Sequence, residues 1–269
     1  MTLARMWRGP RLQLASLTYH EIGDDPTTTG FQRPGARRYR ISTRAFAAHL
    51  DAIAEAALPM LVTMVDFTRV SRNVLLTFDD GGKSARYTAD ALAARGWHGH
   101  FFIVTSLLGG RTFLDATDVR AIHDAGHVIG SHSHTHPDIF KDLTPAQLIE
   151  EWRVSRDRLA QILGAAPVAA SVPGGDISPD VMRSADAAGF RYLFTSEPWL
   201  MPCRVGDCHV LGRYTVTGGT QAATIGALVR ARGWGWALLV RRMKGLLRAA
   251  FPQWYRQYVR HTTSPESVT

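Results

Sequence analysis

Short apolar runs alternate with amphipathic segments along most of the chain. Several of the apolar runs end abruptly at glycine or aspartate, and each is short enough to be a buried strand. The segments between them carry apolar residues three or four positions apart, which is the spacing of one helix face. This pattern predicts strands at Leu12–Tyr19, Val74–Phe78, His100–Val104, Val128–Gly130, Val168–Val172, Tyr192–Thr195 and Leu211–Val216.

The clearest predicted helix is Pro145–Leu163. Thr144 is its expected N-cap, Gln147 completes a capping box, and Gly164 ends it. Regular alternation of strands and helices implies a largely parallel sheet covered by helices, and both an open sheet and a closed barrel fit this pattern. Further helices are predicted from Ser42 or Thr43 to Ala57, at Ser84–Arg95, at Asp115–Ala125, and from Pro179 to Gly189.

Composition and charge narrow the class of protein. The chain has 269 residues, of which 45% are apolar and 20% charged, as in soluble globular proteins. The residues up to Arg213 are nearly neutral, with 23 basic and 22 acidic side chains, whereas those after it carry 8 basic residues and one acid. A nucleic-acid-binding domain would have a basic stripe on its body, so we expect no nucleic-acid partner.

The sequence predicts a cytoplasmic location. No apolar run reaches the ~18 residues of a membrane span, and the basic start lacks the apolar stretch of a signal peptide. Cys203 and Cys208 are therefore expected to be free thiols.

Polar clusters directly follow three of the predicted strands. These are Asp79-Asp80, the histidines 132, 134 and 136 before Pro137, and the segment 173–175. The carboxyl ends of parallel strands share one edge, where ligands gather. One carboxylate and two imidazoles would make a metal site with an open position for water, and the second aspartate would be free to act as a base. Spacing alone does not decide which histidines bind. Taken alone, Asp79-Asp80-Gly81 would be an ordinary turn, and the alternative for the histidine run is an incidental solvated loop.

These residues resemble the NodB-type polysaccharide deacetylases of carbohydrate esterase family 4. Their first motif, TFDDG, appears at 77–81, and their second, a histidine followed four residues later by His-Pro, appears at His132 and His136-Pro137. The resemblance, from about Leu14 to Val216, implies a distorted (β/α) barrel with about seven strands. It also implies that Asp79 is the general base and that Asp80, His132 and His136, but not His134, hold a divalent metal, most often zinc.

Two motifs depart from the family pattern. The third usually reads Arg-x-Pro-Tyr-Gly, but residues 171–175 read Ser-Val-Pro-Gly-Gly, so the arginine that holds the base is absent. The Gly174 N–H remains available as an oxyanion donor. The fifth motif usually supplies a histidine as general acid, but 211–214 read Leu-Gly-Arg-Tyr. Because Arg213 lies at a predicted strand end, we hypothesise that it pairs with Asp79. The alternative is a plain surface arginine.

The missing acid has a candidate near the start of the chain. Residues 17–22, followed by Asp24-Asp25, resemble the start of the permuted branch of the family, which includes the poly-N-acetylglucosamine deacetylases. That resemblance implies that His20 is the general acid. Trp199 is expected to border the substrate by stacking on a sugar ring, with core packing as the alternative. Together with Gly174 and Arg213, it forms the set that we assign to the substrate side.

The sequence therefore predicts a catalytic domain at 1–216 that removes an N-acetyl group from an acetamido sugar of a polysaccharide or its precursor. The alternatives are an amidase acting on a non-sugar C–N bond and a catalytically silent carbohydrate-binding protein. Residues 217–269 are predicted to be a basic, aromatic-rich helical extension. In Trp236–Ala250 apolar residues share one helix face and cations another. This pattern predicts either peripheral contact with an anionic membrane, at its inner face and near lipid-linked precursors, or a terminal helix packed on the barrel.

Overall fold

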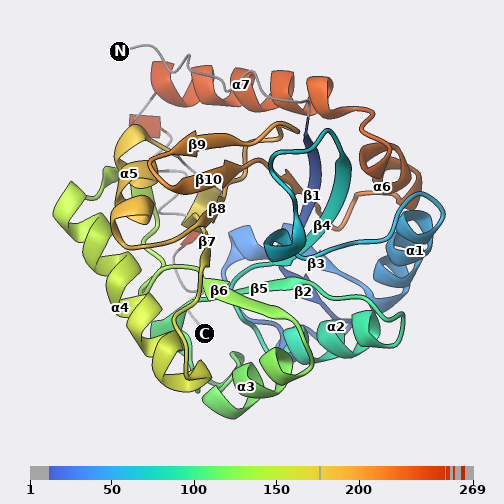
Figure 1. Cartoon of the computed structure of the whole chain (residues 1–269), viewed down its shortest axis with the longest axis horizontal. Helices are drawn as coiled ribbons and strands as arrows, with labels where there is room; N and C mark the ends of the chain where they lie inside the picture. Colours follow the sequence, from blue (N-terminus) through green and yellow to red (C-terminus); the bar gives the residue numbers. More distant parts are fainter. Residues whose placement is uncertain (1–11, 176, 252, 255–256, 258–261, 264–269) are drawn as a thin grey trace.

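The protein is a curled, nine-stranded sheet surrounded by helices (Figure 1). This computed structural model describes residues 12–175, 177–251, 253–254, 257 and 262–263. Within this sheet eight of the described strands run parallel, and only β9 is antiparallel to its neighbour β10. The order across the sheet is β11 (Tyr214–Thr215), β1 (Gln13–Tyr19), β4 (Arg72–Phe78), β5 (His100–Ile103), β6 (Val128–Ser131), β7 (Ala169–Ser171), β8 (Tyr192–Phe194), β10 (Cys208–Leu211) and β9 (Cys203–Val205).

The sheet curls because β10 and β11 lie towards opposite ends of this order but follow each other closely in the chain. Only Gly212 and Arg213 separate them. The single strand predicted at Leu211–Val216 is wrong, because the chain turns a corner within it and forms parts of two strands. The chain stops pairing with β8 at Leu211 and starts pairing with β1 at Tyr214, so no single strand continues through the corner. The distorted barrel implied by the family resemblance is confirmed, and the open sheet is not. The sheet has nine described strands where about seven were expected.

The helices begin and end largely where the capping signals predict. α4 spans Pro145–Leu163, both hydrogen bonds of the Thr144–Gln147 capping box form, and Gly164 ends the helix with a left-handed φ of 78°. The others are α1 (Thr43–Ala54), α2 (Ser84–Ala93), α3 (Ala116–Asp124), α5 (Pro179–Ala187), α6 (Ala222–Val229) and α7 (Trp234–Ala250). Short 3₁₀ segments occur at Pro26–Thr28, Pro34–Tyr39, Val62–Met64, Thr105–Leu107, Phe140–Asp142 and Pro173–Gly175. Strand β2 (Glu21–Ile22) pairs with β3 (Arg40–Ile41).

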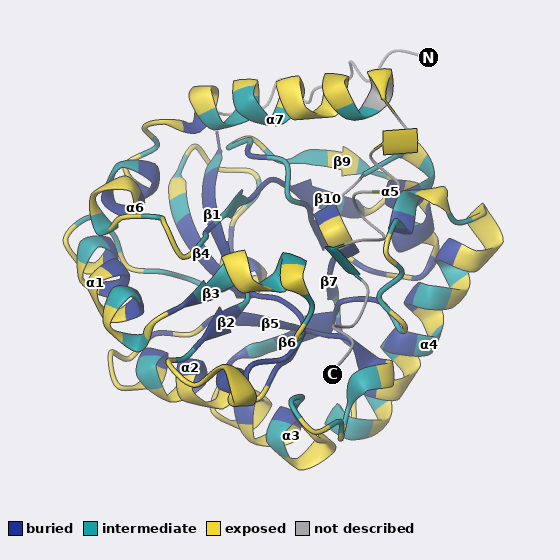
Figure 2. Cartoon of the chain, turned by 180° about the vertical axis from the view of Figure 1, so that it is seen from behind, coloured by how far each residue is buried: buried dark blue, intermediate teal, exposed yellow. Residues whose placement is uncertain are grey.

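The core lies on both faces of the curled sheet. Most of the strands are buried, β9 and β11 are only partly so, and the outward faces of the helices are exposed (Figure 2). Ile225, Leu228 and Val229 of α6 belong to the same core cluster as β1 and α1, so the first part of the predicted extension packs into the body. The boundary at residue 216 stays a prediction.

None of the described helices combines the length and hydropathy needed to cross a bilayer. Cys203 and Cys208 are both free thiols.

Candidate active site

The polar clusters expected at strand ends do gather at one edge of the barrel. His20 follows β1, Asp79 and Asp80 follow β4, and His132 follows β6. Tyr19 pairs with Phe78 in register, and the Asp79 N–H donates to the Tyr19 carbonyl at 3.0 Å. The strand register therefore places His20 and Asp79 at the same level of neighbouring strands.

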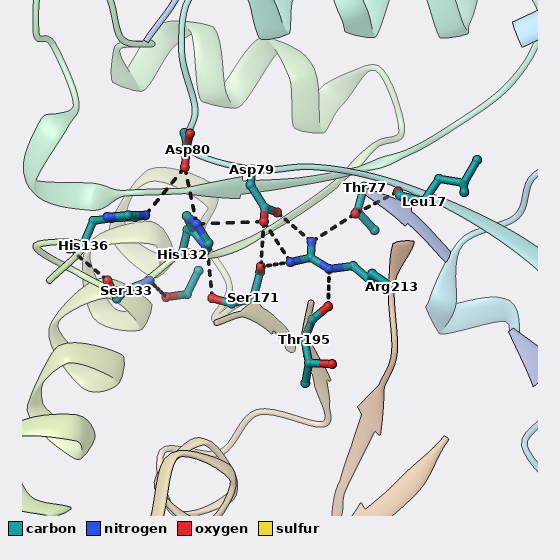
Figure 3. Close-up of polar contacts among 11 residues, drawn as sticks. Leu17, Thr77, Asp79, Asp80, His132, Ser133, His136, Ser171, Thr195 and Arg213 are labelled. Carbon is teal, nitrogen blue, oxygen red and sulfur yellow. Dashed lines mark hydrogen bonds and ion pairs between the residues drawn. The ribbon is translucent and has the colours of Figure 1, made fainter. Parts of the chain in front are cut away.

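Asp80, His132 and His136 form a compact group that fits a divalent metal. The Oδ1 of Asp80 lies 3.4 Å from the Nε2 of His132 and 3.8 Å from the Nε2 of His136 (Figure 3). Zinc bonds of about 2.0–2.1 Å in a tetrahedron separate ligand atoms by roughly 3.4 Å. The potential ligand atoms all lie within 4.8 Å of one another, so the donor set and its spacing suit a zinc-like ion.

Hydrogen bonds fix how these ligands are presented. The His132 Nδ1 lies 3.0 Å from the Ser171 carbonyl, which makes Nδ1 the protonated nitrogen and leaves Nε2 for a metal. The backbone N–H of His136 donates to the Ser133 hydroxyl at 3.0 Å. As the resemblance implies, His134 lies outside the group, and its Nδ1 is 2.9 Å from the Thr105 hydroxyl.

The loop that carries His136 is held by a carboxylate from α4. Glu151 accepts hydrogen bonds from the backbone N–H groups of His134 and Thr135, at 2.9 and 2.8 Å, and from the Thr135 hydroxyl at 2.6 Å. This contact was not predicted, because nothing in the helical pattern of α4 distinguishes Glu151 from its exposed neighbour Glu150.

The turns at the site contain unusual backbone conformations. Asp80, Ser133 and His136 have φ angles of 77°, 64° and 54°, in the left-handed region that residues other than glycine rarely adopt. Among the described non-glycine residues only one other, Ala231, shares this feature. Concentration of such strain at one place is typical of functional sites.

Asp79 is held by a buried arginine, as hypothesised from the sequence. The Arg213 guanidinium donates to both carboxylate oxygens, at 2.7 and 2.8 Å (Figure 3). It also donates to the Ser171 hydroxyl at 2.7 Å and the Thr195 carbonyl at 2.8 Å. Arg213 is fully buried, so it positions Asp79 and presents no surface to a substrate, contrary to its assignment to the substrate side.

Ser171 occupies the position where the family motif usually has arginine. Its hydroxyl lies 3.1 Å from Asp79 and also accepts from Arg213. A small side chain on β7 thus leaves space for an arginine that enters from the corner between β10 and β11. From the sequence, Ser171 was only a departure from the family motif. Its contacts with Asp79 and Arg213 were not predicted.

These contacts set the ionisation of the site. Burial alone would raise the pKa of Asp79, but the Arg213 guanidinium and His132 hold that pKa well below its usual range. Burial is likewise outweighed at Asp80, whose pKa is lowered by its hydrogen bond to His132 and by the nearby histidines. Burial and the charge of His132 lower the pKa of His136 to about 4. The site therefore holds two carboxylates and a neutral imidazole, which are groups able to bind a cation.

His20 stacks on Tyr39, with ring centroids 4.6 Å apart. Enclosure by the protein lowers its pKa, and the charges of Asp80 and Asp79 oppose this effect. Its Nδ1 is buried and has no hydrogen-bond partner among the described residues. His20 is thus next to the base in space, as a proton donor would need to be, while its role as the acid stays a prediction.

Glu21, the next residue, is buried behind the site. The Ser84 hydroxyl donates to its Oε2 at 2.5 Å. A Cβ atom at Gly82 would lie only 2.2 Å from its Oε1, so glycine is required for this close approach. Burial raises the pKa of Glu21 to about 8, and the carboxyl is therefore mostly protonated at neutral pH.

The two remaining residues assigned to the substrate side differ in their surroundings. Gly174 is exposed between two buried neighbours and has a left-handed φ of 62°. Trp199 packs against the core cluster of β7, α5 and β10, and a Cβ at Gly212 would lie 2.3 Å from its indole. The structure gives Trp199 a packing role, and its contact with substrate stays a prediction.

The fold and this site define a polysaccharide deacetylase domain of the NodB type. Residues 68–193 match the polysaccharide deacetylase family, and the chain contains a domain of that family. The chain is 32% identical over 105 residues to a chitin deacetylase of Arthroderma benhamiae, an alignment that covers 38% of this chain and 27% of that protein. The chain therefore spans about a quarter of that relative's length.

Solved structures share the fold over a longer stretch. IcaB from Ammonifex degensii has a TM-score of 0.67 and 22% identity, covering 82% of this chain and 98% of that one. A polysaccharide deacetylase from Bacillus cereus has a TM-score of 0.68 and 18% identity, covering 81% and 69%. At these identities the likeness establishes the fold alone.

Proposed function

We propose that this protein is a metal-dependent N-deacetylase that removes the acetyl group from an acetamido sugar. The observation that carries the proposal is the arrangement of Asp80, His132 and His136 beside a separate carboxylate, Asp79, which a buried arginine holds ionised. Asp80, His132 and His136 would hold the metal, for which zinc is the best candidate. When bound, such an ion supplies a Lewis acid that polarises the acetyl carbonyl and lowers the pKa of water.

Asp79 acts as the base that accepts a proton from the attacking water. Its low pKa keeps it ionised across the neutral range, and its bidentate contact with Arg213 fixes the orientation of the carboxylate. A base that is buried and fixed needs no reorganisation when the proton transfers.

His20 acts as the general acid that protonates the departing amine. It stands at the level of Asp79 on the neighbouring strand, so a substrate held beside the base is also beside this imidazole. The exposed N–H of Gly174 contributes a hydrogen bond to the developing oxyanion. The products are acetate and a free amino sugar.

The substrate is proposed to be an acetamido sugar within a polysaccharide or its precursor. The family match and the chitin deacetylase relative both favour this class over amides without a sugar. Poly-N-acetylglucosamine is one candidate polymer, because residues 17–25 resemble the start of the permuted branch of the family.

The test measures bound zinc and acetate release from N-acetylglucosamine oligomers in the same preparations. The parent should bind about one zinc per chain and release acetate. Asp80→Ala should lose both, Asp79→Asn should keep zinc but lose activity, and Asp90→Ala, an exposed carboxylate on α2, should change neither. Zinc and sugar binding without acetate release would indicate a silent binding protein. Activity on small amides but not on sugars would indicate an amidase.

A further inference from the structure

Helix α7 presents a continuous apolar face to solvent. Trp236, Leu239, Met243 and Leu247 lie three or four residues apart and therefore share one side of the helix. Their exposed fractions are 71%, 50%, 54% and 58%, and the adjacent Leu246 is 66% exposed. Isolated exposed apolar side chains are ordinary, but a stripe of this length marks a surface that contacts something else.

The opposite side of α7 is fixed to the body, so this exposure is not that of an undocked helix. Trp234 is buried, and its indole N–H donates to the Leu228 carbonyl at 2.9 Å. Arg241 forms an ion pair with Glu197 at 2.8 Å and donates to the Gly175 carbonyl at 2.6 Å. In both views α7 lies along one side of the molecule, next to β9 (Figures 1 and 2).

Cations border the apolar face on both sides. At about 100° per residue, Arg242 falls on one flank of the stripe and Lys244 on the other, and both are exposed. After Asp207 the chain has a single acidic residue, Glu266. An apolar stripe with an exposed cation on each flank matches an anionic lipid surface, in which the acyl chains contact the apolar side chains and the phosphates contact the two cations.

We propose that α7 is a membrane-docking helix that lies in the interface of an anionic phospholipid bilayer. The same charges disfavour a second copy of this chain as the occupant, because two such faces would bring cations against cations. Arg241 joins α7 to the loops after β7 and β8, so docking would hold the candidate active site next to the membrane. The proposal does not depend on the deacetylase activity.

The experiment is co-sedimentation of the full chain with vesicles of phosphatidylcholine containing about a third phosphatidylglycerol, and with phosphatidylcholine alone. The parent should bind the anionic vesicles more tightly, and added salt should weaken this binding. Each cation near an anionic surface contributes about fivefold to partitioning. Arg242→Glu combined with Lys244→Glu should therefore reduce binding by at least ~30-fold, and Leu239→Gln, Met243→Gln and Leu247→Gln together should reduce it on both vesicle types.

Matched controls are available elsewhere on the surface. Leu58, Met64 and Val70 are 76%, 68% and 71% exposed, and changing all three to Gln alters as many exposed apolar residues outside α7. Arg120→Glu with Arg153→Glu makes the same charge change on α3 and α4. Both controls should bind vesicles like the parent, and all variants should keep its thermal midpoint.

The proposal is overturned if the parent stays in solution with anionic vesicles, or if the α7 variants bind as well as the controls do. Light scattering in solution provides a further test. A parent dimer that becomes monomeric in the α7 triple variant, without vesicle binding by the parent, would assign the face to a second copy of the chain instead.

Discussion

At the scale of single residues, Arg213 and Asp79 form the central pair of the site. Both side chains are buried, both carboxylate oxygens are engaged, and the remaining guanidinium donors reach Thr77, Ser171 and Thr195. Because the guanidinium is planar and forked, lysine cannot reproduce this bidentate contact.

Arg213→Lys should therefore lower kcat/KM by about tenfold or more, since a misplaced base is a poor proton acceptor. The pKa of Asp79 should rise as the contact weakens, so the acidic limb of the pH–rate profile should move to higher pH. Rates measured from about pH 2.5 to 9 check this, because a limb set by Asp79 in the parent lies below the ordinary carboxyl range. The exposed Arg204→Lys is the control. Full activity with an unchanged profile would contradict the positioning role.

His20→Asn tests the general acid. Loss of a positioned proton donor typically lowers the rate by 100- to 10,000-fold. Zinc content should stay that of the parent, because His20 is outside the group of potential metal ligands. The exposed His123→Asn on α3 is the matched control. A rate within twofold of the parent would remove His20 from the mechanism.

Individual residues of the site were predictable where their neighbours in sequence identify them. Asp79, Asp80 and His132 come directly after apolar strands, and the structure brings them together with His136. The choice of His132 and His136 over His134 came from the family resemblance and not from spacing. Ser171 and Thr195 were not predictable as partners of Arg213. Their contacts depend on how a side chain from a distant corner crosses the barrel, and no local pattern records this.

At the scale of elements, helix α4 supports the loop that carries His136 through Glu151. Its bounds were predictable because Thr144, Gln147 and Gly164 each satisfy a terminal backbone group locally. The hairpin of β9 and β10 was not predicted. Its strands are short, and no residue of β9 is fully buried, so β9 lacks the apolar run that identifies a buried strand.

Glu151→Gln should weaken zinc binding by about tenfold, because it removes the charge that holds the backbone of the His136 loop. Competition with a chromogenic chelator measures this affinity. Glu150→Gln, one residue earlier on the same helix and exposed, should leave it unchanged. Equal affinities in the two variants would show that the loop needs no support from α4.

At the scale of the whole molecule, Glu21 links folding stability to pH. Its pKa is about 8 in the folded protein against 4.5 ordinarily, so the folded state holds a proton that the unfolded state releases. Stability contributed by this group is present below pH 4.5 and is lost as the pH rises through 8. The slope approaches about 1.4 kcal/mol per pH unit within this window.

Relative to the parent, Glu21→Gln should therefore gain stability as the pH increases from 5 to about 8, and the difference should level off above that pH. Urea unfolding at several pH values gives the two free energies of unfolding. Glu55→Gln, an exposed position, should follow the parent throughout. Parallel curves for Glu21→Gln and the parent would place the Glu21 pKa near its ordinary value.

From the alternation of strands and helices, only the class of the sheet was predictable, and its curled shape was not. Alternating strands and helices indicated a parallel sheet, but its closure depends on the two residues between β10 and β11, which resemble the interior of a strand in sequence. The pattern predicts a strand through Gly212 and Arg213 because apolar and β-prone residues continue on both sides.

The left-handed residues at the site have a consequence for protein engineering. Non-glycine residues in this conformation typically each cost of the order of 1 kcal/mol or more, and Asp80, Ser133 and His136 are all of this kind. Random libraries screened only for heat resistance should therefore accumulate glycine or asparagine at these positions. Such variants would gain stability while losing the geometry of the metal ligands, so selection for thermostability needs a simultaneous screen for activity.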